Sequence, residues 1–351
     1  MLFIPHKHLY ISGTSYVSAD EPDYKEVITD ANSRRRMGRL LKMAVWCGLK
    51  SLEGVPSERV SGIITSTGAG FMKDTISFGS SIFDREETLL NPSPFMQSTF
   101  NTASGYIALI RKIHAYNTTY VQQADGFAAS VIDAAMLLDD AGEGNVALVG
   151  AFDEVTPEVD VIRQRLGLYR VGDGFLPLGE GAAAFLLSAA KPTDVSECYT
   201  GPLRESESAS LKGGDDCSES SSVPLNESES ASERGGESGS ESSSEPLHEY
   251  GGTSSRSLNG TKDGNAVLRF CGLANLSDLP KCAENPIAEL FGINAGVNVI
   301  SCADHVESLG AFRSLLPVLL CKLISVQQIP DGYTAIVDDV NENGVIVLLH
   351  N

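Results

Sequence analysis

The stretch NTTYVQQADGFAASVIDAA, residues 117–135, has the pattern of a strand, a tight turn and a buried helix. The positive end of a helix dipole lies at such a turn and favours the ionised form of a thiol or carboxyl group. A nucleophile held there could accept an acyl group as a covalent intermediate. No Cys, Ser or Thr occurs between Val121 and Ala129. The polar side chains that the turn offers are Gln122, Gln123 and Asp125. An amide forms hydrogen bonds but no thioester, and an acyl anhydride on the carboxylate would be a poor intermediate.

Two acidic residues and a glycine turn follow other predicted strands. Asp153 and Glu154 come directly after an apolar strand, where they can cap a helix or line a cleft. The stretch TGAG, residues 67–70, has the glycines of a phosphate-binding loop but lacks the Lys-Ser/Thr pair that follows in such loops. A tight turn is therefore the favoured interpretation.

One dense basic cluster interrupts an acidic chain. Its members are Arg34, Arg35, Arg36, Arg39 and Lys42. Such a charge run commonly forms the solvated start of a helix. The alternative is a docking surface for an acidic partner or a phosphate group, which guanidinium groups bind with good geometry.

The seven cysteines indicate buried free thiols. They are scattered, their number is odd, and no two have the C-x-x-C spacing. This distribution argues against a zinc site and against a disulfide framework. We therefore expect no metal and no cofactor.

Alternating strands and helices must position these groups. Apolar strands are expected over 8–17, 60–67, 118–121, 144–154, 179–188 and 298–302, with a hairpin over 333–350 closed at Asn343-Gly344. Helices are expected over 33–54, in the second part of 91–114, over 130–142 and over 307–326, the last kinked at Pro317. Apolar strands that alternate with helices predict a layered α/β fold.

Charge and hydropathy exclude several classes of partner. The formal net charge is −20, which argues against nucleic acid and anionic membranes. The longest apolar run, SLLPVLLCKLI, is too short to span a bilayer. The first ten residues carry charges and a proline where a signal peptide needs an apolar segment, so a cytoplasmic protein is expected.

A repeat with a period of 22 residues lies in the second half of the chain. Residues 202–222 are followed by a near copy at 224–244, and a third start follows at Pro246. Residues 202–246 include eleven acids, three bases and fifteen serines. This composition offers too little apolar surface to offset the entropy of ordering, which excludes a solenoid. We expect a disordered acidic linker over 200–262, with a docking tether as the alternative function. It separates residues 1–199 from residues 263–351.

Several motifs, taken in order, resemble the β-ketoacyl synthase family, which has the thiolase fold. They are RRRMGRLLKMA, STFNTASGYIAL, YVQQADGFAASVIDAA, ALVGAFDE, GEGAAAFLL and VNVISCADHVESLGAF. The resemblance covers most of 1–190 and about 288–349. It implies a thiolase-like layered αβαβα fold with a shortened C-terminal half and the acidic insert.

The resemblance also implies where a catalytic site would lie. The family nucleophile is a cysteine on the strand-to-helix turn, and two histidines assist decarboxylation of a malonyl group on a carrier protein. Gln123 takes the cysteine position, or Gln122 or Asp125 if the register shifts. The family's H-G-T-G-T loop has no counterpart. The late-loop histidine corresponds to His305, although its spacing to Gly310 is one residue short.

A glutamine in place of the cysteine resembles the chain-length factors, which pair with an active ketosynthase. The resemblance therefore implies a non-catalytic partner subunit of a β-ketoacyl-ACP synthase in fatty-acid or polyketide biosynthesis, with aryl-polyene pathways included. It implies a heterodimer with a ketosynthase, or a homodimer, formed through the strand of Tyr120 and Val121. The basic cluster would then bind the acyl carrier protein. Two alternatives stay open: an active acyltransferase or decarboxylase with a non-cysteine site, and a scaffold that binds acyl carriers.

Overall fold

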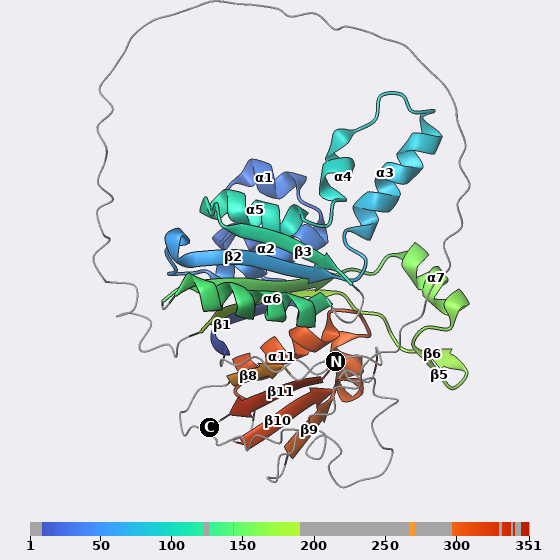
Figure 1. The fold of residues 1–351 in the computed structure, drawn as a ribbon. Coiled ribbons are helices and arrows are strands. Elements are labelled where there is room, and N and C mark those ends of the chain that lie inside the picture. Colours follow the sequence, from blue (N-terminus) through green and yellow to red (C-terminus); the bar gives the residue numbers. More distant parts are fainter. Residues whose placement is uncertain are drawn as a thin grey trace, which may run out of the picture. The chain divides into compact units, whose positions relative to one another are not determined.

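The computed structural model describes residues 9–122, 126–142, 144–189, 267–270, 297–329, 332–337, 340 and 345–350 (Figure 1). A nine-stranded sheet runs through this part of the chain in the order β3-β2-β4-β7-β1-β8-β11-β10-β9. Its strands are β1 (Leu9–Val17), β2 (Val60–Thr67), β3 (Tyr116–Val121), β4 (Val146–Asp153), β7 (Gly181–Ser188), β8 (Val267–Phe270), β9 (Val297–Ser301), β10 (Gly332–Val337) and β11 (Val345–His350). A separate two-stranded hairpin joins β5 (Arg170–Val171) to β6 (Gly174–Phe175).

Strand direction defines where a site can form. β2 is parallel to β3 and β4, and β7 is antiparallel to both β4 and β1. The carboxyl ends of β2, β3 and β4 therefore meet at one edge, the usual position of sites in such sheets. In the later half, β10 is parallel to β9 and antiparallel to β11, which confirms the expected hairpin.

Helices cover both faces of the sheet over the strands β3, β2, β4, β7 and β1. One face carries α2 (Arg39–Ser51) and α5 (Thr102–Arg111), and the other carries α6 (Gly126–Ala141) and α11 (Leu315–Ser325) (Figure 1). The first core gathers Leu41, Val45 and Ile107 against Leu148 and Leu186 of the sheet. The second core packs α6 and α11 against the opposite side of the same strands. Each buried aliphatic side chain contributes about 1.5–3 kcal/mol.

The remaining helices are shorter or lie outside these layers. They are α1 (Ala31–Arg36), α3 (Met72–Asp84), α4 (Pro92–Gln97), α7 (Pro157–Leu166) and α10 (Val306–Leu309), with 3₁₀ turns at Tyr24–Glu26, Ser57–Arg59 and Ala303–His305. None of the helices in the described part of the chain is long and apolar enough to cross a membrane. The sheet flanked by helices confirms the thiolase-like α/β fold. The acidic repeat lies outside the described residues, so its predicted disorder and the domain boundaries drawn around it stay predictions.

Two of the expected helices are interrupted. The helix expected over 33–54 is split at Met37 and Gly38 into α1 and α2. The side chain of Gln97 holds this break, because it accepts from the amide of Gly38 at 2.9 Å and donates to the carbonyl of Arg36. The helix expected over 307–326 divides into α10 and α11. Pro317 does not kink it; Pro317 lies in the first turn of α11, where a missing N–H costs no helical hydrogen bond.

A close approach of two backbones interrupts that second helix. The amide of Ala311 donates to the carbonyl of Pro177 at 2.7 Å, and the amide of Gly179 donates to the carbonyl of Ala311 at 3.3 Å. A Cβ on Gly179 would lie 2.0 Å from the carbonyl oxygen of Leu309, and one on Gly310 would lie 2.4 Å from the amide nitrogen of Gly179. Only glycine fits at both positions. The contact ties the segment before β7 to the start of α11 and so brings α11 to the sheet edge.

Candidate functional site

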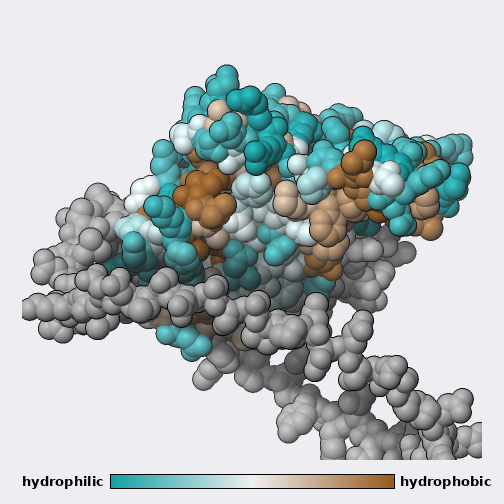
Figure 2. Space-filling view, turned by 90° about the horizontal axis from the view of Figure 1, so that it is seen from above, coloured by the Kyte–Doolittle hydropathy of each residue, from teal (hydrophilic) through white to brown (hydrophobic). Residues whose placement is uncertain are grey.

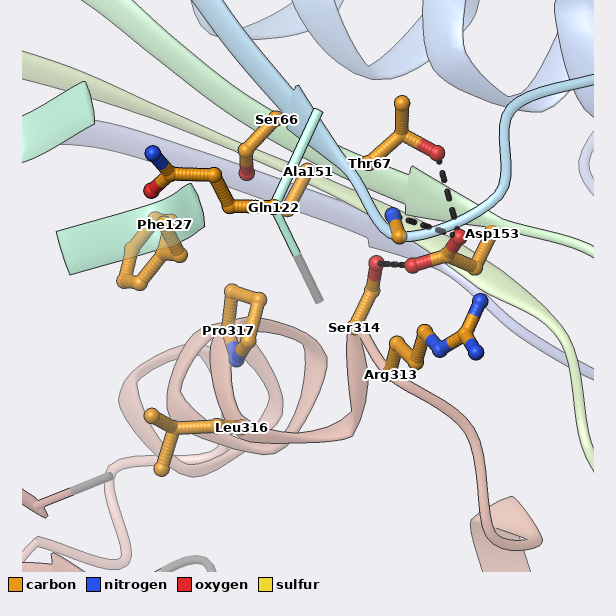
Figure 3. A pocket seen from close by; sticks show the side chains of 11 residues that line it. Ser66, Thr67, Gln122, Phe127, Ala151, Asp153, Arg313, Ser314, Leu316 and Pro317 are labelled. Carbon is orange, nitrogen blue, oxygen red and sulfur yellow. Dashed lines mark hydrogen bonds between the residues drawn. The ribbon is translucent and has the colours of Figure 1, made fainter. Parts of the chain in front are cut away.

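A pocket lies at the edge where β2 and β4 end and α6 and α11 begin (Figure 3). β2 supplies Ser66 and Thr67, β4 supplies Ala151 and Asp153, and the segment before α11 supplies Arg313 and Ser314. Phe127 of α6 and Pro317 of α11 form the apolar side. The empty space is about 290 Å³, including the opening to solvent.

Asp153 is the most extensively hydrogen-bonded residue of the pocket. Its Oδ1 accepts from Thr67 Oγ1 at 3.0 Å and from the amides of Gly68 and Ala69 at 2.9 and 3.1 Å. Its Oδ2 accepts from Ser314 Oγ at 2.6 Å. The residue is only 4% exposed. One side chain thus joins the turn after β2, the end of β4 and the start of α11.

Burial dominates the acidity of this carboxyl group. Loss of solvation raises the pKa of Asp153 above its ordinary value, and the four donors oppose that rise. Burial also raises the pKa of Glu154, and the nearby charge of Asp74 raises it further. Glu154 Oε1 accepts from the amide of Lys73 at 2.7 Å, in the first turn of α3. Asp153 therefore lines the cleft while Glu154 caps a helix, so the two alternatives left open by the sequence each apply to one residue.

The TGAG stretch is a tight turn, as favoured from the sequence. Two of its backbone amides donate to Asp153, and the amide of Gly70 donates to Thr67 Oγ1 at 2.8 Å. The carboxylate of Asp153 thus accepts the hydrogen bonds from the backbone amides that would have to bind a phosphate.

The residues on either side of the strand-to-helix turn line the same pocket. Gln122, the residue after β3, lines it together with Phe127 from the first turn of α6 (Figure 3). Gln123 and Asp125 lie outside the described residues, so their role at the nucleophile position stays a prediction. A glutamine amide at this place can donate and accept hydrogen bonds but cannot form a thioester.

His305 is not among the residues that line the pocket. It ends a 3₁₀ turn, half-buried, ahead of α10. The late loop instead brings Arg313 and Ser314 to the pocket, and sequence reasoning missed both. The signal was weak, because their placement depends on the break at Gly310 that ends α10 early.

The predicted basic cluster divides into two groups. Arg39 forms ion pairs with Glu21 and Glu180. Arg34 donates to the carbonyls of Ile28 and Thr29, in the segment before α1. The remaining members are Arg35, Arg36 and Lys42. Arg35 and Arg36 are exposed at the end of α1. These two arginines are therefore accessible to solvent.

β3 forms one edge of the sheet and is hydrogen-bonded only to β2 in the described part of the chain. Val121 is 43% exposed and Tyr120 is half-buried. The hydroxyls of Tyr116 and Tyr120 donate to Asp133 of α6 at 3.0 and 3.1 Å. Both predicted interface residues therefore lie on an open strand edge.

The described cysteines fit the expectation of buried thiols. Cys47, Cys302 and Cys321 are buried cysteines. Burial raises the pKa of the Cys321 thiol well above its ordinary value. No group of three or more possible metal ligands occurs within the described ranges.

Comparison with known proteins agrees with this architecture. Residues 14–222, more than half of the chain, match the model of the β-ketoacyl synthase N-terminal domain. No curated protein matches the sequence. The structure of the ishigamide ketosynthase/chain length factor is similar over 98% of this chain and 99% of its own, with 13% identity and a TM-score of 0.58.

Two further solved structures are similar over a smaller part of this chain. A β-ketoacyl synthase from Burkholderia phymatum STM815 has 13% identity and a TM-score of 0.44, over 55% of this chain and 61% of its own. The ketosynthase ApeO in complex with its chain length factor ApeC, from Xenorhabdus doucetiae, has 16% identity and a TM-score of 0.37, over 54% of this chain and 80% of the matched chain. The family match, the sheet with its helices, and the pocket at the turn before α6 together show that this chain belongs to the β-ketoacyl synthase family.

Proposed function

We propose that this chain is a non-catalytic, chain-length-factor-like partner subunit of a β-ketoacyl-ACP synthase in fatty-acid or polyketide biosynthesis. One observation carries the proposal. Gln122 and Phe127, which flank the turn that leads into α6, line the pocket, yet no Cys, Ser or Thr occurs from Val121 to Ala129. A chain with this fold and no acyl-accepting side chain at that turn has lost the covalent step but can still shape a site.

The hydroxyl groups in the pocket do not replace the missing thiol. Ser66 Oγ donates to the carbonyl of Gly150 at 3.2 Å, and the hydroxyls of Thr67 and Ser314 both donate to Asp153. The described residues that line the pocket include no His, Cys or Lys. An acyl transfer by serine needs a base that takes its proton and returns it to a leaving group, a role usually filled by His.

The open edge of β3 supports a partner chain. An unpaired strand edge is a template for association, and pairing removes that liability. Apolar side chains lie on both sides of it: Leu109 of α5 is 74% exposed and Met136 of α6 is 59% exposed. Figure 2, which looks onto the side of α1, α4 and α5, shows apolar patches within a mainly hydrophilic face. The proposed partner is a ketosynthase that carries its own catalytic cysteine, with a homodimer as the alternative.

A ketosynthase partner also suggests the ligand of the basic cluster, the cellular location and the pathway. The acyl carrier protein is the proposed ligand of Arg35 and Arg36, because carrier proteins are acidic and these arginines are exposed. A protein that works with such carriers is proposed to be cytoplasmic. Aryl-polyene biosynthesis is included in the proposal because chain-length-factor pairs also act in such pathways.

Acylation is the direct test. The purified chain is incubated with acyl-carrier thioesters, with a cysteine-containing ketosynthase as the positive control, and both intact masses are measured. The ketosynthase gains one acyl group, and this chain gains none. A stoichiometric adduct on residues 117–135 would overturn the proposal.

One observation favours a second function. Ser314 Oγ lies 2.6 Å from a buried carboxylate, the arrangement of a hydroxyl beside a base. An acyltransferase that uses Ser314 would give an acyl adduct on that residue, which peptide mapping locates and Ser314→Ala abolishes. Ser314 is only 3% exposed and the described pocket has no imidazole, so the partner-subunit function is the better supported of the two.

A further inference from the structure

The helix α6 presents two carboxyl groups beside the open edge of β3. Asp133, Met136 and Asp140 follow one another at helical spacing, so they share one side of the helix, which we call the α6 stripe. Met136 is 59% exposed, and Asp140 is exposed as well. Asp133 accepts hydrogen bonds from the hydroxyls of Tyr116 and Tyr120. Because both tyrosines belong to β3, the α6 stripe lies on the side of the helix next to the strand edge.

The α6 stripe has no basic residue near it in the sequence. Residues 115–142, from the start of β3 to the end of α6, contain four acids and no Lys, Arg or His. Burial and the nearby charge of Asp133 raise the pKa of Tyr120 to about 12, so its hydroxyl stays protonated and donates at neutral pH. The carboxyl group of Asp133 is therefore held in place beside the edge, and its charge is not balanced locally.

A second copy of this chain at β3 would bring two α6 stripes together. Two identical edge strands pair antiparallel about a two-fold axis that is perpendicular to the sheet. Such an axis makes each face of the sheet continuous with the same face of the second copy. Because α5 and α6 cover opposite faces of the sheet (Figure 1), α6 would face α6 of the second copy, and α5 would face α5.

The two facing helices would be close enough for their charges to repel. α6 packs mainly on β2, the strand next to the edge. Strands lie about 4.8 Å apart, so two such helices would be about three strand spacings, or roughly 14 Å, apart. A helix with its side chains is about 10–12 Å wide, which leaves only a narrow gap between the two stripes. The carboxylates would thus lie within a Debye length, about 8 Å at physiological ionic strength.

The other parts of this edge do not oppose pairing with a second copy. Leu109 of α5 is 74% exposed, and burial of this side chain favours association with any apolar surface. Val121 on the strand edge is 43% exposed and carries no charge. The charge of the α6 stripe is therefore the feature of this edge that distinguishes a second copy from a different chain.

We propose that the α6 stripe excludes a second copy of this chain at β3 and selects a different chain with basic side chains opposite α6. The inference rests on the proposed function, because it takes β3 as the contact with the partner. It adds the chemistry of that partner, which presents an edge strand together with Lys or Arg on the facing helix. Opposite charges favour this chain, and like charges act against the wrong one.

The oligomeric state of the isolated chain tests the exclusion. In sedimentation equilibrium at about 0.05 M NaCl we expect a monomeric wild type. Asp133→Asn/Asp140→Asn should associate with itself at least about tenfold more tightly, and each Asn keeps an oxygen that accepts hydrogen bonds. At about 1 M NaCl, screening should reduce the difference between the two proteins. Val121→Asp, added to the neutralised variant, should return it to the monomer.

A charge-reversed copy tests the chemistry of the partner. Asp133→Asn/Met136→Lys/Asp140→Lys makes the α6 stripe basic. This copy should be monomeric alone but should form a heterodimer with the wild type at low salt, because opposite charges then face each other. Glu158→Gln/Asp173→Asn, which removes two exposed carboxylates on α7 and on the turn between β5 and β6, is the matched control and should stay monomeric. Thermal melting checks that each variant is folded.

Three results would overturn the inference. A wild-type dimer at about 0.05 M NaCl that Val121→Asp dissociates means that the α6 stripe does not exclude a second copy. A neutralised variant that stays monomeric means that charge is not what prevents self-association. If the wild type and the charge-reversed copy do not associate, opposite charges do not select the partner. In each case co-purification with a ketosynthase and the acylation test still decide the proposed function separately.

Discussion

A single buried carboxyl group joins three segments at the pocket. Because burial raises the pKa of Asp153, the folded chain holds the proton more tightly than the unfolded chain, in which the pKa is about 3.9. Its contribution to stability is therefore complete below the unfolded pKa and is lost as pH rises through the raised folded value. Asp153→Asn stays neutral throughout and keeps an acceptor for the turn amides. We expect the wild type to lose free energy of unfolding relative to this variant as the pH rises from about 4, the unfolded pKa.

Urea unfolding of both proteins across that range measures the difference. Asp84, in the last turn of α3, offers a matched control, because Asp84→Asn removes an exposed carboxylate and should give a nearly flat difference. If the free energy of unfolding of the wild type instead rises with pH relative to Asp153→Asn, the four hydrogen-bond donors outweigh burial and lower the pKa of Asp153.

At the scale of elements, the backbone contact between Gly179 and Gly310 positions α11. Gly310 has φ +75°, and its Cβ would lie 2.4 Å from a backbone nitrogen. Gly142 also has a left-handed backbone, φ +82°, but nothing lies within 4 Å of its Cβ position. Gly142→Ala should cost about 1 kcal/mol of unfolding free energy from backbone strain alone. Gly310→Ala should cost about 3 kcal/mol, because the overlap with backbone is added. Equal costs in urea unfolding would mean that the contact is dispensable.

The basic helix α1 permits a test of carrier-protein docking. Arg35 and Arg36 are exposed, whereas Arg39 pairs with Glu21 and Glu180. Reversal of the two exposed charges to Glu should weaken carrier-protein binding about five- to tenfold, with a smaller salt dependence and an unchanged melting temperature. Surface plasmon resonance at two salt concentrations measures both effects. If the double variant binds the carrier protein with unchanged affinity, the two arginines do not form a docking surface.

At the scale of the whole molecule, the edge of β3 is the proposed contact with a second chain. Val121→Asp places a charge on that edge and should abolish co-purification with a ketosynthase expressed together with this chain. Val326, 48% exposed at the end of α11, provides the control: Val326→Asp should leave the complex intact. The pair should condense malonyl units while neither chain does so alone. Co-purification of the Val121→Asp chain at the wild-type level would exclude β3 as the interface.

The order of apolar strands and helices was readable from local sequence. Apolar runs and helical spacing are local properties, so β1, β2, β4 and β7 lie where the pattern predicts them. The predicted helix over 130–142 is α6, which begins earlier, at Gly126, and Gly142 follows its end with a left-handed backbone. The loss of the acyl-accepting side chain was also readable, because it needs only residue identities from Val121 to Ala129. The helices α3 and α7 were not anticipated, since α3 buries none of its residues and α7 only Arg163, so neither carries a strong apolar stripe.

Only the tertiary structure decided which polar groups meet. Asp153 and Ser314 are 161 residues apart, and their hydrogen bond depends on the turn after β2 and on the glycine contact that stops α10. No local pattern encodes such a juxtaposition. The same holds for His305, which family spacing directed to the pocket, whereas the break at Gly310 brings Arg313 and Ser314 there. The physical reason is that spacing determines secondary structure over a few residues, whereas a site is made by packing between segments that lie far apart in the chain.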